Sequence, residues 1–206
     1  MREGSLIYIV DDDRHIREST SLMLEGHGYR CAVYSSAAEF LAENPKSSDG
    51  CLLLDIRMPG PDGLAVQNEL AQRGLTLPII FMTGFNDVVH AVRAMKAGAV
   101  DYIEKPCPPH AVLDAIDRAL NRSRKDQVIA DEVRAAQRRF ARLSPREQGV
   151  VKGLVAGNPS KVIARKLGVS MREVETYRAR IMDKMEATSL AELVKIALAA
   201  SSEQSV

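Results

Sequence analysis

The stretch CLLLDIRMPGPDG, residues 51–63, decides the fold of this chain. Apolar residues run into a single carboxylate, Asp55, and Pro and Gly follow it. This pattern is typical of a short buried strand and not of a helix. Asp55 then stands at the carboxyl end of the strand, where ligands collect in open α/β sheets. Taken alone, this Asp could equally well cap the following turn.

The same design recurs along the first half of the chain. Apolar, β-rich runs are predicted to be strands at 6–10, 29–34, 51–55, 78–82 and 100–104. Helical patterns lie between and after them at 16–25, 37–43, 64–73, 88–97 and 111–122. Five strands that alternate with five helices predict an α/β fold, a five-stranded doubly wound parallel sheet with helices on both faces.

Polar residues stand where these strands end. They are Asp11, Asp12, Asp55, Thr83 and Lys105. Each alone could be a cap, a turn residue or a surface charge, but parallel strands bring all five to one edge of the sheet. Carboxylates without Cys or His favour Mg²⁺. An Asp beside such an ion, a hydroxyl and a Lys is suited to forming an aspartyl phosphate, with the cations and the hydroxyl stabilising the phosphoryl oxygens.

Residues 6 to about 122 resemble the receiver domain of two-component response regulators, a flavodoxin-like fold. The resemblance is carried by VDDD, LLLDIRMPGPDG, MTG and MKAGAVDYIEKP. The sequence of these motifs is most similar to that of the FixJ-like group. It implies that Asp55 is the phospho-acceptor, assisted by Thr83 and Lys105. It also implies that Mg²⁺ is held by Asp55, Asp12, the carbonyl of Arg57 and, through water, Asp11. Thr83 and Tyr102 would be the switch pair.

Some residues depart from this resemblance. The FixJ-like sequence pattern is not followed at Phe85, Asn86, Val89 and Cys107. The differences at Phe85 and Asn86 leave the details of signal relay open. Cys107 could be redox-active or simply a substituted residue. Asp13 has no matching role and is interpreted as a helix cap.

Bulk properties point to two domains in a reducing compartment. The 206 residues are 46% hydrophobic with a net charge of +1. Residues 1–120 carry 11 Lys and Arg against 17 Asp and Glu, whereas residues 121–206 carry 17 against 10. The basic half is therefore a candidate for binding nucleic acid. Three scattered Cys, no signal-peptide pattern and no apolar run of membrane-spanning length predict a cytoplasmic protein without a membrane partner.

The second half predicts a helix-turn-helix. Residues 121–142 are charged and predict a solvated helix and linker. Ser144, Pro145 and Glu147 then form a helix-start signal with a capping box. Helices are expected from there to about 155, at 161–167, at 172–185 and at 190–199, with a short turn at 168–170. We expect domains at 1–122 and 143–206, joined by a helical linker at 123–142.

The third of these helices has two faces. Val174, Ile181 and Met185 are expected to point inward. Arg and Lys on the other face would bind phosphates, Glu175 could accept from cytosine, and Thr176 could offer its hydroxyl or methyl group. An ordinary solvated helix is the alternative. The predicted DNA-binding residues are Lys161, Arg172, Glu175, Thr176, Arg178, Ala179, Arg180 and Lys184.

Residues 143 to about 200 resemble the LuxR-type DNA-binding domain, through LSPRE, NPSKVIARKLGVS and VETYRARIMDKMEATSLAELVKIA. This resemblance implies a small all-α domain whose third helix enters the major groove and whose fourth contributes to dimers. Pro159, Glu175 and Ala179 depart from many relatives, and Pro159 is expected to shape the start of the second helix.

Together these features predict a transcription regulator and not an enzyme. A sensor histidine kinase would phosphorylate Asp55. The resemblance implies that the chain would then dimerise through the receiver, on the face formed by its fourth helix and fifth strand, and bind promoter DNA as a homodimer, with RNA polymerase a further candidate partner. Two alternatives stay open: a receiver that is only a phosphorylation-independent dimerisation scaffold, and a phosphatase with Asp55 as nucleophile. The phosphatase would need an acidic residue at position 57, which is Arg.

Overall fold

The structure, a computed structural model, describes residues 5–43, 50–84 and 88–201. Phe85 and Asn86, which differ from the FixJ-like sequence pattern, lie outside these residues, so their role in signal relay stays a prediction. The chain divides into two compact units, Met1–Gln127 and Val128–Val206. Each unit has its own hydrophobic core and is described separately below.

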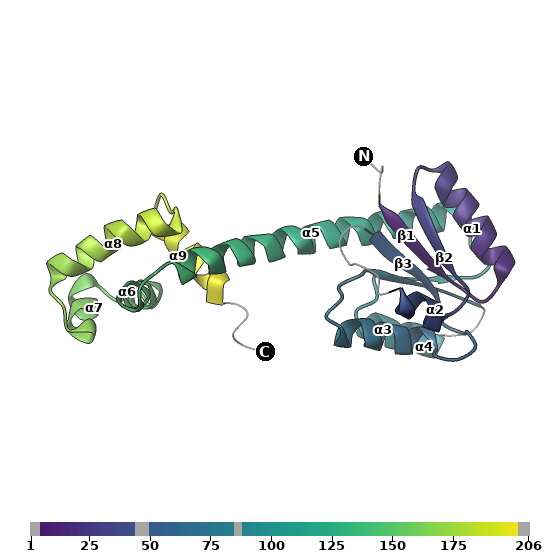
Figure 1. The fold of residues 1–206 in the computed structure, drawn as a ribbon, viewed down its shortest axis with the longest axis horizontal. Coiled ribbons are helices and arrows are strands. Elements are labelled where there is room, and N and C mark those ends of the chain that lie inside the picture. Colours follow the sequence, from purple (N-terminus) through teal and green to yellow (C-terminus); the bar gives the residue numbers. More distant parts are fainter. Residues whose placement is uncertain (1–4, 44–49, 85–87, 202–206) are drawn as a thin grey trace. The chain divides into compact units, whose positions relative to one another are not determined.

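The first unit is a five-stranded parallel sheet in the order β2-β1-β3-β4-β5. Its strands are β1 (Leu6–Val10), β2 (Arg30–Tyr34), β3 (Gly50–Asp55), β4 (Ile79–Thr83) and β5 (Asp101–Glu104). Its helices are α1 (Arg14–Gly26), α2 (Ala37–Ala42), α3 (Gly63–Gln72), α4 (Val88–Lys96) and the start of α5 (Pro109–Ala141). The predicted fold class is confirmed (Figure 1).

Side chains of the sheet alternate between two cores, one on each face. Leu52 and Leu54 pack with Val66 of α3 and Ala94 of α4, in a cluster that also includes α2. The intervening Leu53 belongs to the opposite cluster, which includes α1 and α5. Strands buried on both faces read as continuous apolar runs, which is why residues 51–54 carry no polar position.

Helix α5 is longer than the sequence prediction. The expected helix at 111–122 and the expected linker helix form one helix of 33 residues, Pro109–Ala141. After Pro109 this segment contains neither Pro nor Gly, so no residue interrupts the backbone hydrogen bonding. The boundary between the two units falls within α5. Nowhere in the described ranges does a helix combine the length and apolar character needed to cross a membrane.

The second unit contains the C-terminal part of α5 and four shorter helices, α6 (Pro145–Val155), α7 (Ser160–Leu167), α8 (Met171–Met185) and α9 (Leu190–Ser201). The predicted capping box opens α6, with the Ser144 N–H donating to Glu147 Oε2 at 2.7 Å and Ser144 Oγ accepting from the Glu147 N–H at 3.4 Å. Pro159 occupies the N-cap of α7.

The turn between α7 and α8 is short because Gly168 ends α7 in the left-handed region, at φ 65°. Glycine adopts this conformation at little cost, so the chain can pass from α7 to α8 through a turn of three residues. Ser170 then caps α8 with a second capping box. As predicted, Val174, Ile181 and Met185 are buried in the core of this unit. The expected helix-turn-helix is therefore present.

Candidate functional site

Four side chains are brought to the carboxyl edge of the sheet by the ends of four strands. Asp11 directly follows β1, Asp55 ends β3, Thr83 ends β4 and Lys105 directly follows β5. The register aligns these ends, since Val10 pairs with Leu54, Asp55 with Met82 and Thr83 with Glu104.

Lys105 joins the two buried carboxylates of this edge. Its Nζ lies 2.5 Å from Asp11 Oδ2 and 2.7 Å from Asp55 Oδ2. The side chains of Asp11, Asp55 and Lys105 are only 1%, 10% and 14% exposed. Charges removed from water in this way interact strongly, so the cation and both anions are held in one arrangement.

Backbone N–H groups hold the remaining carboxylate oxygens. The Asp13 N–H donates to Asp11 Oδ1 at 3.0 Å, and the Arg57 N–H donates to Asp55 Oδ1 at 3.1 Å. Arg17, which the sequence reading missed, donates from Nη1 to the backbone carbonyl of Asp11 at 2.7 Å. Asp13 caps α1 by accepting from the His15 N–H at 2.8 Å, so its interpretation as a cap is confirmed.

Gly63 makes room behind Asp55. A Cβ atom at this position would lie 2.6 Å from the Asp55 carbonyl oxygen and 2.9 Å from Phe81 Cε1. Any larger residue would therefore displace the end of β3, where the carboxylate is held. The final Gly of the opening stretch is required for this close approach of α3 to the strand.

The pKa shifts at this edge follow from burial and pairing. Burial raises the pKa of the Asp11 carboxyl, and the hydrogen bond from Lys105 opposes this only in part. Burial alone would lower the pKa of Lys105, but its hydrogen bonds to Asp11 and Asp55, together with their charges, outweigh burial and raise that pKa. Lys105 is therefore a permanent cation at neutral pH.

The acidic residues fit a divalent cation. Asp11, Asp12 and Asp55 each offer a carboxylate oxygen, and these atoms lie within 4.8 Å of one another. Three carboxylates against the one charge of Lys105 leave two uncompensated negative charges. A set of oxygen ligands without Cys or His suits Mg²⁺. The Arg57 carbonyl and the water-mediated role of Asp11 stay predictions.

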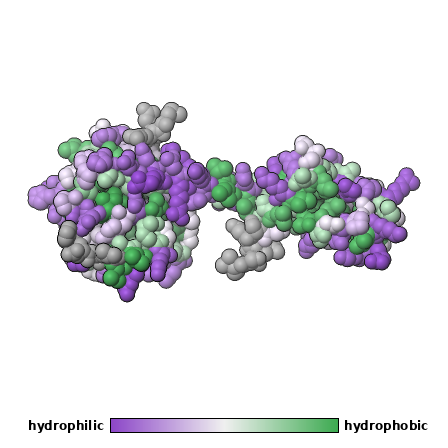
Figure 2. All heavy atoms as spheres, turned by 180° about the vertical axis from the view of Figure 1, so that it is seen from behind, coloured by the Kyte–Doolittle hydropathy of each residue, from purple (hydrophilic) through white to green (hydrophobic). Residues whose placement is uncertain are grey.

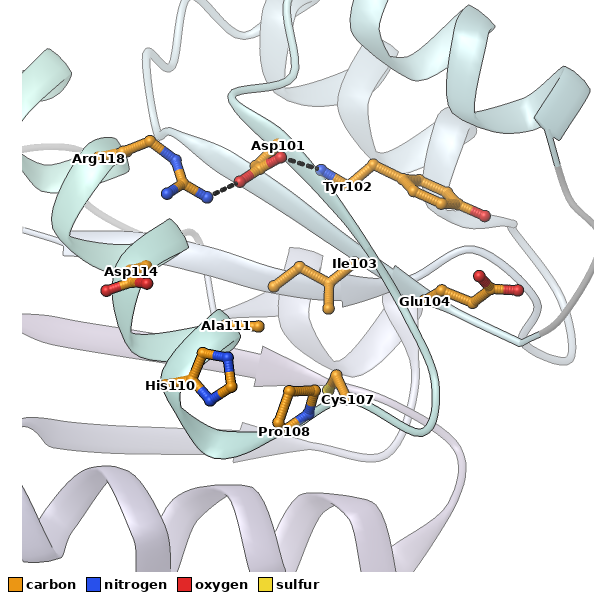
Figure 3. A pocket seen from close by; sticks show the side chains of 10 residues that line it. All are labelled: Asp101, Tyr102, Ile103, Glu104, Cys107, Pro108, His110, Ala111, Asp114 and Arg118. Atoms are coloured by element: carbon orange, nitrogen blue, oxygen red, sulfur yellow. Dashed lines mark hydrogen bonds and ion pairs between the residues drawn. The ribbon is translucent and has the colours of Figure 1, made fainter.

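The predicted switch residues lie on β4 and β5. Thr83 is fully buried, and among the described residues its Oγ1 has no hydrogen-bond partner. An unsatisfied buried hydroxyl is costly and points to a function. Tyr102 packs against the core cluster of α2, α3 and α4, whereas its neighbour Ile103 belongs to the opposite cluster. Figure 3 shows these two side chains leaving β5 in different directions.

A hollow of about 470 Å³ lies between β5 and α5 (Figure 3). Asp101 and Arg118, which form an ion pair, are among the residues that line it, and the lining includes none of Asp11, Asp55 and Lys105. The hollow is thus separate from the acidic site. Cys107 lines it, and burial raises the pKa of this thiol. A protonated thiol is a poor nucleophile, which favours the simple substitution over a redox role.

In the second unit six of the eight residues predicted to contact DNA are exposed. Those that are exposed are Lys161, Arg172, Glu175, Thr176, Ala179 and Arg180. The Thr176 hydroxyl donates to the Arg172 carbonyl at 3.0 Å, so its methyl group and lone pairs are what remain for DNA. Arg178 and Lys184 are partly buried and paired with carboxylates, which distinguishes them from the other basic residues of this set.

Lys184 binds a buried acid within its own unit. Its Nζ lies 3.0 and 2.7 Å from the two carboxylate oxygens of Glu147, whose side chain is only 3% exposed. The sequence identified Glu147 as a cap but not as this partner, because the two residues are 37 positions apart. Lys184 therefore links α8 to the start of α6, in addition to any contact with DNA.

We expect the Glu147→Gln variant to unfold with a free energy about 2–3 kcal/mol below wild type at pH 7, because it leaves the Lys184 charge without its partner. The ion pair and the cap outweigh burial and lower the pKa of Glu147 below its ordinary 4.5. The stabilisation is thus complete above pH 4.5 and is lost as the pH falls through the lowered pKa. Urea unfolding from about pH 7 to 3 should show a smaller decline in the variant. Asp183→Asn, at an exposed acid of α8, is the control, and equal declines in Glu147→Gln and wild type would refute the assignment.

Comparison with known proteins finds a matching family for each of the two units. Residues 7–117 match the family described as response regulator receiver domain, and residues 141–197 match the bacterial regulatory proteins of the luxR family. The transcriptional regulatory protein FixJ of Azorhizobium caulinodans is 43% identical, covering 97% of this chain and 95% of the relative. FixJ of Bradyrhizobium diazoefficiens is 41% identical, covering 94% and 95%.

A solved structure extends the likeness to the whole fold. The response regulator StyR is 34% identical with a TM-score of 0.81, over 94% of this chain and 98% of that chain. The two family matches follow one another along the chain in the same order as the acidic site and the helix-turn-helix. The chain therefore belongs to the two-component response regulators of the FixJ-like group, in which a receiver domain precedes a LuxR-type DNA-binding domain.

Proposed function

We propose that Asp55 is the residue through which this phosphorylation-activated transcription regulator is switched on. A sensor histidine kinase would donate the phosphoryl group, and the phosphorylated chain would bind promoter DNA as a dimer. The observation that carries the proposal is Lys105 bridging Asp11 and Asp55 at the carboxyl edge of a parallel sheet. Such an arrangement holds a nucleophile beside a fixed cation.

In the proposed reaction a carboxylate oxygen of Asp55 attacks phosphorus. A new O–P bond forms as the N–P bond of the donor phosphohistidine breaks, and the electron pair leaves with the imidazole nitrogen. Lys105 is already within hydrogen-bond distance of the nucleophile and stabilises the oxygens of the transferring group. Mg²⁺ held by Asp12, Asp55 and the Arg57 carbonyl, with Asp11 acting through water, would neutralise charge on the same oxygens.

The proposed switch begins at Thr83. Its buried hydroxyl, which has no hydrogen-bond partner in the described part of the chain, would donate to the phosphoryl group. The movement of Thr83 would vacate space beside β4 that the ring of Tyr102 then fills. Because Tyr102 already packs against the cluster that includes α4, this change would alter the surface formed by α4 and β5. Phosphorylation would thus bias a two-state element by a local change in charge.

We assign receiver dimerisation to that surface. Val89, Val92 and Met95 of α4 are 64%, 48% and 45% exposed, an apolar set that a second copy could cover. In the second unit Leu190 and Leu198 of α9 are also exposed, and apolar residues reach the surface of both units in Figure 2. We assign α9 to contacts between DNA-bound copies. A cytoplasmic location and contact with RNA polymerase belong to the same proposal.

Two boundaries complete the proposal. We place the receiver domain at 1–122 and the DNA-binding domain at 143–206, with 123–142 as a helical linker.

The relatives named above are transcriptional regulators, which supports a non-enzymatic role. The alternative of a phosphorylation-independent scaffold rests on Phe85 and Asn86, outside the described residues. The phosphatase alternative lacks its expected acid, since Arg57 occupies that position.

The test is to treat the chain with a small phosphodonor and Mg²⁺ and to map the modified residue. Borohydride reduction of an acyl phosphate followed by peptide mass spectrometry should identify the peptide that contains Asp55. The phosphorylated chain should also bind a promoter library more tightly than the untreated chain. Modification at another residue would overturn the assignment of Asp55. Equal DNA affinity with and without phosphorylation would favour the scaffold alternative.

A further inference from the structure

We infer that Ser160 is a positioning residue for DNA readout, which fixes Glu175 on the recognition helix α8 so that one carboxylate oxygen is presented to a cytosine. Arg178 completes this reading unit, defined as Ser160, Glu175 and Arg178. The inference rests on the proposed use of the exposed α8 face for DNA. It goes further by assigning to Ser160, a residue outside α8, the orientation of Glu175 toward that base.

The reading unit joins the two helices of the helix-turn-helix. Ser160 is the first residue of α7, and its Oγ donates to Glu175 Oε1 at 2.8 Å. Arg178, one turn after Glu175 on α8, donates from Nη1 to the same Oε1 at 3.2 Å. Arg178 Nη1 also lies 3.5 Å from Ser160 Oγ. The three side chains therefore form a small network across the turn.

The two oxygens of Glu175 are used unequally. Oε1 accepts from both Ser160 and Arg178, whereas among the described residues the only contact of Oε2 is the longer one of 3.4 Å with Arg178. A carboxylate oxygen can accept two hydrogen bonds, so Oε2 retains capacity for a further donor. The Glu175 side chain is 57% exposed, so a ligand can reach its carboxylate group. The donor that a carboxylate matches in the major groove is the N4 amino group of cytosine.

Arg178 gives this carboxylate a local counter-charge. A bare Glu on a DNA-binding face is repelled by the phosphates, and the guanidinium one turn away offsets that repulsion. The side chain of Arg178 is 34% exposed, less than that of its partner Glu175, as expected for a residue that faces the network and not the phosphates. The pKa of Glu175 is lowered chiefly by the hydrogen bond from Ser160, which keeps it an acceptor.

The hydrogen bond from Ser160 restricts the orientation of the Glu175 side chain. A Glu side chain on an exposed helix face has considerable rotamer freedom, and ordering it on binding costs free energy. Ser160 is anchored by α7, whose Ile163 and Ala164 are buried in the core of the unit. The hydroxyl therefore fixes the carboxylate before DNA arrives. Loss of the hydroxyl should reduce selectivity between bases without removing a phosphate contact.

The test is selection of binding sites from a randomised DNA duplex by the full-length, phosphorylated chain. We compare wild type with Ser160→Ala, Ser160→Thr and Glu175→Gln. Wild type should prefer cytosine at one position of each half-site by about 10-fold, and Ser160→Ala should reduce that preference by about 3–10-fold. Ser160→Thr, which keeps the hydroxyl, should retain it. Glu175→Gln should lose the preference for cytosine at the same position.

The salt dependence of binding separates positioning from a general structural effect. Because Ser160 contacts no phosphate in this assignment, log Kd against log salt concentration should have the same slope in wild type and Ser160→Ala. An unchanged base preference in Ser160→Ala would overturn the inference, as would an equal loss of affinity for every sequence. A wild-type chain that selects sites without a cytosine affected by Glu175 would also overturn it, while the proposed function would stand. A chain that selects no sequence would contradict both.

Discussion

The Asp55→Asn variant is expected to accept no phosphoryl group from a small phosphodonor under conditions that fully modify wild type. An amide in place of the carboxylate has the same shape but no nucleophilic oxygen anion. Its single carbonyl oxygen can accept only one of the two hydrogen bonds of wild type, either that from the Arg57 N–H at 3.1 Å or that from Lys105 at 2.7 Å, because the amide nitrogen replaces the other oxygen. Intact-mass spectrometry after treatment should therefore detect the added phosphoryl group in wild type alone.

Folding and general acidity are the controls for this variant. The unfolding free energy of Asp55→Asn should equal or exceed that of wild type, because one of two buried carboxylates beside Lys105 is neutralised and their mutual repulsion is removed. Asp114→Asn, at an exposed acid of α5, should be phosphorylated like wild type. Full phosphorylation of Asp55→Asn would show that the acceptor is another residue and would refute the site assignment.

The Lys105→Met variant is expected to lose about 2–4 kcal/mol of stability at pH 7 in the absence of divalent cations. Asp11 and Asp55 would then face each other as buried anions without the ammonium that now joins them. Addition of Mg²⁺ should recover part of this loss relative to wild type, because the three carboxylates carry one more uncompensated charge than in wild type. The affinity for Mg²⁺ should accordingly rise by about 10-fold, a difference of about 1.4 kcal/mol.

Thermal unfolding with and without Mg²⁺, together with calorimetric titration of the ion, measures both expectations. Lys96→Met, at an exposed position in the last turn of α4, provides the matched loss of one positive charge. It should alter neither the stability nor the Mg²⁺ affinity by more than a small amount. Weaker Mg²⁺ binding in Lys105→Met than in wild type would contradict the account of the charges at this edge.

The acidic site was predictable because its positions follow from topology. Each residue stands where an apolar strand ends, and parallel strands must end on one edge, so Asp55 and Lys105 could be placed together although 50 residues separate them. The hydrogen-bond partners were less accessible. Lys105 bridges two carboxylates, and Thr83 Oγ1 has no described hydrogen-bond partner. Both facts depend on the exact placement of side chains, which a pattern of residue types does not contain.

The exposed residues of α8 that we propose to bind DNA were predicted as a set, but their contacts with other helices were not. Helical periodicity separates the buried Val174 from the exposed Arg172, because it depends only on position along α8. It cannot reveal that Lys184 binds Glu147 or that Ser160 binds Glu175, since those partners belong to other helices. Long side chains choose partners through tertiary packing, and the count of basic residues on a face therefore overstates the number available to phosphates.

The central claim, that phosphorylation of Asp55 drives self-association, is tested most directly by light scattering. The molar mass of wild type and Asp55→Asn would be measured with Mg²⁺, before and after treatment with a small phosphodonor. We predict that wild type changes from monomer to dimer on treatment and that Asp55→Asn remains a monomer. An unchanged molar mass in fully phosphorylated wild type, together with unaltered DNA binding, would contradict the account and favour the receiver as a phosphorylation-independent scaffold.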